Sequence, residues 1–186
     1  SRTESEHCLL VLVVNAGAAI ARLRSNPHFA WAAPNYIFSA LRTPNDPRYP
    51  DHYALRTTGQ LGGTEGADID VERAWDVTTG SRTVVVAIID SGVDYTHPDL
   101  AANIWDNPGE ISGNGIDDDQ NGFIDDTRGW DFVNDDNNPA DDAGHGTHVA
   151  GIIGAVTSNG IGIAGVAWNV SLMPLKFLAA DGCGST

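Results

Sequence analysis

The sequence predicts an α/β fold in which helices flank a parallel sheet, and three observations support this. Residues 83–90, TVVVAIID, form a continuous apolar run, which is typical of a strand buried on both faces of a parallel sheet. Residues 146–156 are small and apolar, as in a buried helix, and residues 170–178 form a second strand-like apolar run. Strand, helix and strand in this order indicate an α/β sheet.

The first 42 residues have the pattern of a separate, small α+β unit. Residues 9–14 predict a buried strand, residues 16–29 a short helix, and residues 30–38 a second strand with alternating apolar positions. Residues 41–68 contain three prolines in their first half and disfavour a helix, so we expect a linker there.

The second part of the chain begins with a predicted short helix at residues 71–80, ahead of the apolar strand. Residues 104–142 are rich in Gly, Asn and Asp and predict a long loop. Long loops in compact domains usually carry function. The chain therefore has its candidate functional residues between the first apolar strand and the small-residue helix.

Acidic residues dominate the charge of the chain. The formal net charge is −15, which argues against nucleic-acid binding because phosphates require a basic surface. Of the 25 acidic residues, 15 lie in residues 90–142, where Arg128 is the one Lys or Arg. This crowding favours bound cations, and a solvated acidic surface is the alternative. No apolar run has the length needed to span a bilayer.

Asp90, His145 and His148 are candidates for acid–base or metal chemistry. Asp90 ends the apolar strand, where α/β folds place their sites, and it either orients a histidine or caps a turn. A helix starting near His145 would put the two histidines of DDAGHGTHVAG roughly on one side, but they lack the Glu and third ligand of a catalytic zinc site. The glycines beside His145 favour a tight backbone that opens this residue to a cleft, and His148 is expected to be the more buried.

The segments VVVAIIDSGVDYTHPDL and GHGTHVAG resemble the Asp and His motifs of the subtilisin-like serine proteases. The resemblance covers residues 43–186 and implies a secreted endopeptidase that acts on polypeptides through an Asp-His-Ser triad. Asp90 would orient His145, and His145 would be the general base. The segment NPHFAWAAPNYIF resembles the end of the family's prodomain. Residues 1–42 are therefore expected to be part of an intramolecular inhibitor, and residues 43–186 the N-terminal half of the catalytic domain.

The family's serine motif, of the type Gly-Thr-Ser-Met-Ala, is absent from the sequence, and so is the oxyanion-hole Asn. Ser91 directly follows Asp90 and should point to the opposite side of an extended chain. Cys183 as a thiol nucleophile is a remote alternative. We expect the chain to be a fragment of a longer parent and to be inactive by itself. The alternative function is a non-catalytic calcium-binding or inhibitory fragment that acts by binding alone.

The acidic segment DDDQNGFIDD, residues 117–126, has most of the EF-hand spacing and predicts a Ca²⁺ site. Oxygen donors alternate along it, and a glycine provides the sharp turn. The predicted ligands are Asp117, Asp119, Asn121, the Phe123 carbonyl and Asp125. The twelfth position is Arg128 rather than a bidentate Glu, so the match is incomplete, and a solvated loop is the alternative.

The resemblance implies two further metal sites. Their predicted ligands are hard oxygen atoms, which suit Ca²⁺ rather than zinc. The ligands of the first would be the side chains of Asp46, Asp99 and Asn159 and the carbonyls of Val156, Ile161 and Ile163. The second would lie in residues 130–142, at Asp131 and Asp136.

The segment LAADGCGST, residues 178–186, resembles the edge strand that pairs with the substrate backbone in this family. This resemblance implies substrate-binding roles for Leu178, Gly182, Cys183 and Gly184. The alternative is an ordinary glycine-rich turn.

Overall fold

The structure is a computed structural model that describes residues 15–33 and 43–184. Contacts divide the chain into two units, Ser1–Ala40 and Leu41–Thr186, and each is described by itself. The predicted strand at residues 9–14 lies outside the described residues. Of the predicted strand at residues 30–38, only 30–33 are described, and they are not in a strand.

The described part of the first unit is organised around helix α1, Ala16–Arg24. The Asn15 side chain caps the helix by accepting a hydrogen bond of 3.0 Å from the Ala18 N–H. The helix ends at Arg24, just before Asn26-Pro27, where the sequence indicates its stop. A proline disfavours the helical conformation in the residue before it.

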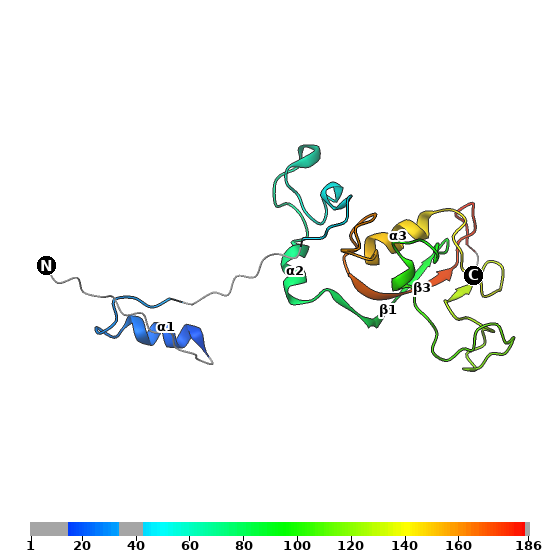
Figure 1. Ribbon diagram of the computed structural model, residues 1–186, viewed down its shortest axis with the longest axis horizontal. Helices are drawn as coiled ribbons and strands as arrows, with labels where there is room; N and C mark the ends of the chain where they lie inside the picture. Colours follow the sequence, from blue (N-terminus) through cyan, green and yellow to red (C-terminus); the bar gives the residue numbers. More distant parts are fainter. Residues whose placement is uncertain (1–14, 34–42, 185–186) are drawn as a thin grey trace. The chain divides into compact units, whose positions relative to one another are not determined.

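The second unit contains a three-stranded parallel sheet with the strand order β1-β3-β2 (Figure 1). Its strands are β1 (Gly80–Asp90), β2 (Trp130–Asp131) and β3 (Asn169–Lys176). Its helices are α2 (Val71–Val77) and α3 (His145–Gly154), with short 3₁₀ turns at Tyr49–Asp51, Gln60–Gly62 and Ala101–Asn103. The predicted α/β class with a parallel sheet flanked by helices is confirmed.

Two boundaries differ from the sequence prediction. Helix α2 ends at Val77 rather than at Gly80, because Gly80 already pairs with Asn169 as the first residue of β1. The predicted loop at residues 104–142 is interrupted by β2, which pairs with the end of β3. The loop therefore returns to the sheet before it reaches α3.

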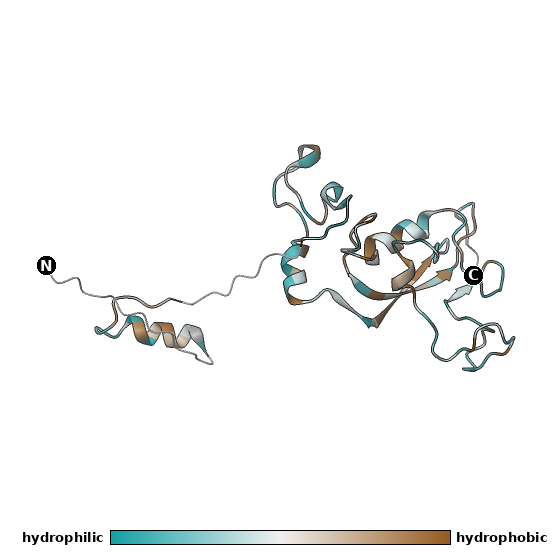
Figure 2. Cartoon of the chain, viewed as in Figure 1, coloured by the Kyte–Doolittle hydropathy of each residue, from teal (hydrophilic) through white to brown (hydrophobic). Residues whose placement is uncertain are grey.

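The register aligns three charged residues at the carboxyl end of the sheet. Asp90 of β1 and Asp131 of β2 are each the partner of Lys176 in the central strand β3. The Lys176 ammonium lies 2.7 Å from Asp142 and 3.4 Å from Asp131. The carboxyl end of the sheet is consequently polar. In the second unit, the hydrophobic residues, brown in Figure 2, are concentrated on the strands and α3.

The core of the sheet lies between α3 and strands β1 and β3. Its buried residues are Ile88, Val93, Leu100, Ile104, Ala150, Val170 and Leu172. Small residues let α3 approach closely, since a Cβ at Gly154 would lie 2.5 Å from Val170 Cγ1. The end of α3 is thereby held close to the start of β3.

The expectation that residues 83–90 are buried on both faces is wrong. Val86 and Ile88 face the core, but Val85 and Ile89 are 47 % and 66 % exposed. Among the described residues, β1 is an edge strand, and α3 covers one of its faces. The apolar run therefore marks a strand without showing how many of its faces are covered.

A second, smaller core surrounds Trp75 of α2. Trp75 is 2 % exposed, packs against Tyr49 and Trp168, and donates a hydrogen bond of 2.8 Å to the Val166 carbonyl. This core fixes residues 49–77 next to the segment that leads into β3. No helix in the described ranges is both long and apolar enough to cross a membrane.

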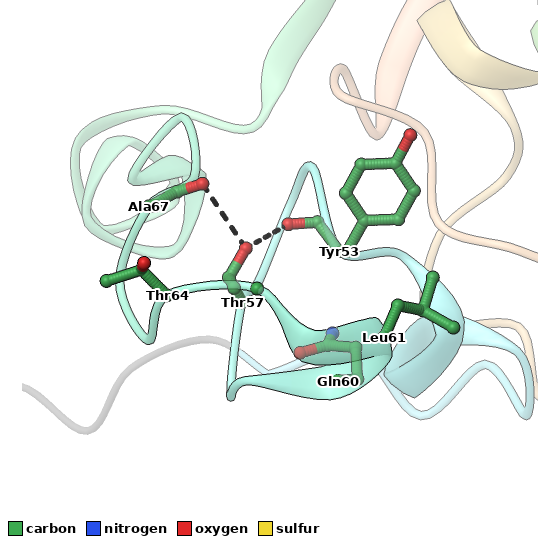
Figure 3. Close-up of a pocket in the computed structure, with 7 residues that line it drawn as sticks. Tyr53, Thr57, Gln60, Leu61, Thr64 and Ala67 are labelled. Atoms are coloured by element: carbon green, nitrogen blue, oxygen red, sulfur yellow. Dashed lines mark hydrogen bonds between the residues drawn. The ribbon is translucent and has the colours of Figure 1, made fainter.

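A pocket of about 360 Å³ opens beside this region, in residues 53–67 (Figure 3). It is lined by Tyr53, Thr57, Gln60, Leu61, Gly63, Thr64 and Ala67. The Thr57 hydroxyl donates hydrogen bonds to the carbonyls of Tyr53 and Ala67. The lining contains no carboxylate or histidine, and Tyr53 is its one ionisable side chain.

Candidate active site

Asp90 and His145 form a direct pair at the carboxyl end of β1. The Nδ1 atom of His145 lies 2.7 Å from Oδ1 and 2.9 Å from Oδ2 of Asp90. Asp90 is the last residue of β1 and His145 the first residue of α3. The sheet thus brings together two residues that are 55 positions apart in the sequence.

The environment of Asp90 keeps it ionised. Partial burial opposes ionisation, but hydrogen bonds from His145 and from the Ser91 N–H outweigh burial and lower the pKa of Asp90 below its usual range. A carboxylate beside Nδ1 makes Nδ1 the donor, which leaves Nε2 unprotonated in the neutral ring. The His145 side chain is 68 % exposed, so Nε2 can accept a proton from a group outside the pair.

His148 does not join this pair. Both histidines are exposed, so the expectation that His148 is the more buried of the two stays a prediction. The two residues are three positions apart in α3, so they lie within about 60° of each other around the helix axis, on the same side of the helix. Among the described residues, neither histidine belongs to a group of three ligands that could hold a metal ion.

Ser91, next to the pair, and Ser171, in β3, both donate hydrogen bonds to groups other than His145. Ser91 is 1 % exposed, and its hydroxyl donates to Asp141 rather than toward His145. Ser171 is buried in β3 and donates to the Arg82 carbonyl. Cys183 is exposed, and its thiol has no hydrogen bond to His145.

Residues 81–186 match the model of the subtilase family of peptidases. The chain belongs to the subtilase family. It is 38 % identical over 173 residues to a thermophilic serine proteinase of Bacillus sp. strain AK1, covering 93 % of this chain and 35 % of that protein. It is 37 % identical over 143 residues to thermitase of Thermoactinomyces vulgaris, covering 77 % of this chain and 39 % of thermitase.

Solved subtilase-like structures resemble the chain as well. The serine protease of Aeromonas sobria, in complex with a chaperone, superimposes with a TM-score of 0.56 and 27 % sequence identity. That match covers 75 % of this chain and 21 % of the Aeromonas chain. The subtilase described here therefore spans about a third of the length of its curated relatives and a fifth of this structural relative.

The residues of the first family-type calcium site lie together in this subtilase. Asp46 and Asp99 are 2 % and 3 % exposed. Asp46 accepts hydrogen bonds from the N–H groups of Ser158 and Asn159, and Asp99 accepts from the Asn159 side chain and the Ile163 N–H. Two buried carboxylates at one loop require a positive charge, and within the described ranges neither forms an ion pair.

Three backbone carbonyls were predicted as further ligands of this site. The predicted ligand carbonyls are those of Val156, Ile161 and Ile163, and within the described ranges none of them accepts a hydrogen bond. Carboxylate, amide and carbonyl oxygens around one loop are the donor set of Ca²⁺. The residues at this loop fit calcium.

The acidic loop brings together a different set of side chains from the predicted one. Carboxylate oxygens of Glu110, Asp119 and Asp126 lie within 4.8 Å of one another, and only Asp119 was among the predicted ligands. Asp117 instead accepts hydrogen bonds from the N–H groups of Asn121 and Gly122. EF-hand spacing could not reveal Glu110, because that residue precedes the matched segment.

Asp125, also a predicted ligand, has a structural role in the described loop. Its carboxylate accepts hydrogen bonds from the N–H groups of Gly113, Asn114 and Gly115.

The Phe123 ring packs on Trp130 with the ring centroids 4.9 Å apart. Arg128, at the twelfth position, stacks over the Tyr95 ring rather than facing the acids.

Asp131 and Asp136 do not resemble a calcium site. Their backbones pair with each other, but the Asp131 carboxylate binds the Asn134 side chain and lies 3.4 Å from the Lys176 ammonium. Burial opposes ionisation of Asp131, and its hydrogen bonds and Lys176 outweigh burial and lower its pKa. Lys176 already supplies the positive charge there, so these residues do not favour a bound cation.

The predicted substrate edge is a turn in this structure. Residues 177–184 leave β3, and the Ala179 N–H donates to the Cys183 carbonyl while the Gly182 N–H donates to Ala179. Cys183 and Gly184 line a pocket of about 270 Å³ with Phe132, Val133 and Phe177, whereas Leu178 is half-buried outside it. Substrate-binding roles for Leu178, Gly182, Cys183 and Gly184 stay predictions.

Proposed function

We propose that the parent of this chain is a secreted serine endopeptidase in which Asp90 and His145 are two members of an Asp-His-Ser triad. The observation that carries the proposal is the hydrogen bond between the His145 Nδ1 atom and both oxygens of the Asp90 carboxylate. Family membership supports it, because the curated relatives are named as serine proteinases. The serine would come from parent sequence beyond these 186 residues.

In this mechanism His145 moves the proton between two partners. Nε2 of His145 takes the proton of the serine hydroxyl as the serine oxygen adds to the peptide carbonyl carbon. The imidazolium then gives that proton to the leaving nitrogen as the C–N bond breaks. Asp90 holds Nδ1–H in place throughout and stabilises the imidazolium by its negative charge. A water molecule releases the acyl group by the same two steps.

Calcium is the proposed stabilising ion, and two groups of residues would hold it. The first comprises Asp46, Asp99, Asn159 and the carbonyls of residues 156, 161 and 163. The second comprises Glu110, Asp119 and Asp126 in the acidic loop. Calcium would neutralise the neighbouring carboxylates in each group, which otherwise repel one another. Residues 1–42 are proposed as part of an inhibitory prodomain.

The first experiment compares the parent with the 186-residue chain. The parent should cleave denatured casein and fluorogenic peptides, and the purified chain should not, because no described serine faces His145. The measurement is the initial rate at equal molar concentration. Cleavage by the chain at the parent's rate would refute the requirement for an outside serine. A correctly folded, processed parent that cleaves neither substrate would leave binding alone as the function.

The second experiment tests calcium at the acidic loop. Asp126→Asn should weaken calcium binding there by roughly tenfold or more, because affinity for Ca²⁺ depends strongly on the number of carboxylate ligands. Terbium luminescence excited through tryptophan is a suitable measurement, since Trp130 contacts Phe123 of this loop. Asp106→Asn removes the same charge from an exposed position in the same loop and should have little effect. Equal losses in both variants would point to diffuse attraction rather than a site.

A further inference from the structure

The carboxylate of Asp141 caps helix α3 at the position of His145. The N-cap residue is Gly144, which has no side chain to accept the first N–H groups of the helix. Asp141 accepts the Gly144 N–H at 2.8 Å, the Ala143 N–H at 3.0 Å and the Thr147 N–H at 2.8 Å. Because α3 begins at His145, these bonds fix the backbone on both sides of that residue.

The same carboxylate binds the segment that follows Asp90. The Ser91 hydroxyl, 1 % exposed, donates a hydrogen bond of 2.8 Å to Asp141 Oδ1. That hydroxyl also accepts the Gly146 N–H at 3.0 Å. Ser91 directly follows Asp90 and Gly146 directly follows His145, so one hydroxyl joins the two segments.

Thr147 provides another connection between the two segments. Its hydroxyl donates to Asp141 and accepts a hydrogen bond of 2.9 Å from the Asp94 N–H. The segments lie so close that a Cβ at Gly146 would be 2.0 Å from the Gly92 carbonyl oxygen. Small errors in this spacing would therefore separate the two residues of the pair.

Only an ionised carboxylate can accept all of these hydrogen bonds. Burial opposes ionisation of Asp141, but the bonds from Thr147, Gly144 and Ala143 outweigh burial and lower the pKa of Asp141 to about 2. All five groups that reach Asp141 are donors, namely three N–H groups and two hydroxyls. An asparagine amide would present its NH₂ group to some of these donors.

We propose that Asp141 is a positioning residue for the Asp90–His145 pair. By binding Ser91 and the first turn of α3 with one carboxylate, it keeps His145 Nδ1 beside Asp90 and so selects the Nδ1–H tautomer. Its importance for catalysis rests on the proposed function, because only the correct tautomer leaves Nε2 free to accept a proton. The tautomer itself is a property of this chain and can be measured without peptidase activity.

The test is the tautomer of His145 in the 186-residue chain, read from ¹⁵N chemical shifts of the ring at a pH where the imidazole is neutral. In the unsubstituted chain, Nδ1 should be protonated and Nε2 unprotonated. In Asp141→Asn, the ratio of the Nδ1–H to the Nε2–H tautomer should fall roughly tenfold or more, the effect of weakening one hydrogen bond to a charged group. A chain with His145→Gln assigns the signals.

Two further variants separate positioning from helix capping and from charge. Ser91→Ala leaves the Asp141 cap intact but breaks the connection to the Asp90 segment, so it should shift the tautomer in the same direction. It also serves if Asp141→Asn does not fold. Asp142→Asn removes a neighbouring charge that pairs with Lys176, and it should leave the tautomer unchanged.

The outcomes distinguish this inference from the proposed function. An unchanged tautomer in Ser91→Ala and in folded Asp141→Asn would overturn the positioning role, and so would an equal shift in Asp142→Asn. A mixed tautomer in the unsubstituted chain would overturn it as well. If the tautomer shifts as expected but the parent cleaves no peptide, the positioning role stands and the proposed function fails.

Discussion

His145→Ala in the parent protein should lower kcat for peptide hydrolysis by roughly 10⁶-fold, the size of effect seen when a triad base is removed. His145 is the side chain whose ring Asp90 binds, and its loss removes the group that takes the serine proton. KM should change little, because the imidazole acts mainly in the transition state. The measurement is kcat and KM with a fluorogenic peptide.

His148→Ala is the matched control for this result. His148 lies on the same helix and is exposed, and its ring has no hydrogen bond to a described residue. This variant should retain the kcat of the unsubstituted parent. A similar loss in both variants would favour a function shared by the two histidines, such as metal binding. A loss below about tenfold in His145→Ala would argue against a general base altogether.

Gly146→Ala should lower the free energy of unfolding of the chain by about 3 kcal/mol, at the upper end of the usual cost of overpacking. A Cβ at this position would lie 2.0 Å from the Gly92 carbonyl oxygen and 3.1 Å from the Asp90 Cβ. Both are close to the backbone and cannot move aside without shifting β1 against α3. Urea denaturation followed by circular dichroism measures the change.

Gly151→Ala, in the same helix, provides the comparison. Its nearest neighbour is the Ile163 Cδ1 atom at 3.3 Å, which is the end of a flexible side chain. Replacing glycine with alanine favours the helix by about 1 kcal/mol in both variants. The difference between their free energies of unfolding therefore isolates the contact with Gly92. Equal stability of the two variants would show that the start of α3 can move away from β1 at little cost.

The main elements of the second unit were predictable because their patterns are local. The apolar run at 83–90 and the small-residue segment at 146–156 predicted β1 and α3 within a few residues. Burial was not predictable in the same way. Val85 and Ile89 are exposed because coverage of a strand depends on distant segments, which an apolar run does not reveal.

The pairing of Asp90 with His145 could be expected from the sequence because the two lie in long motifs. The role proposed for Asp141 could not, because it depends on where five donors from two segments converge. The degree to which each histidine is covered was not predictable for a related reason. Spacing along a helix gives relative directions around its axis, but not which direction is covered.

The acidic loop shows the same limit for metal ligands. A linear spacing rule selects residues within one short segment, and so it found Asp117, Asp119 and Asp125. The fold instead places Glu110 beside Asp119 and Asp126, while Asp117 and Asp125 bind backbone N–H groups. A carboxylate that stabilises a turn and one that faces a cation look alike in sequence.

The contact of Asp46 with residues 158 and 159 closes a ring of chain that contains about three quarters of the second unit. Asp46 and Ser158 are 112 positions apart, and the Arg48 N–H adds a bond to the Gly162 carbonyl. A covalent link across about 100 residues stabilises the folded state by roughly 4.7 kcal/mol at 25 °C, because it lowers the entropy of the unfolded chain. The hydrogen bonds of Asp46 close a similar length of chain reversibly. If calcium holds this closure, the segment around Asp46 and Arg48 separates from residues 158–162 when calcium is withdrawn. That segment is then the first part of the second unit to be exposed to proteolysis.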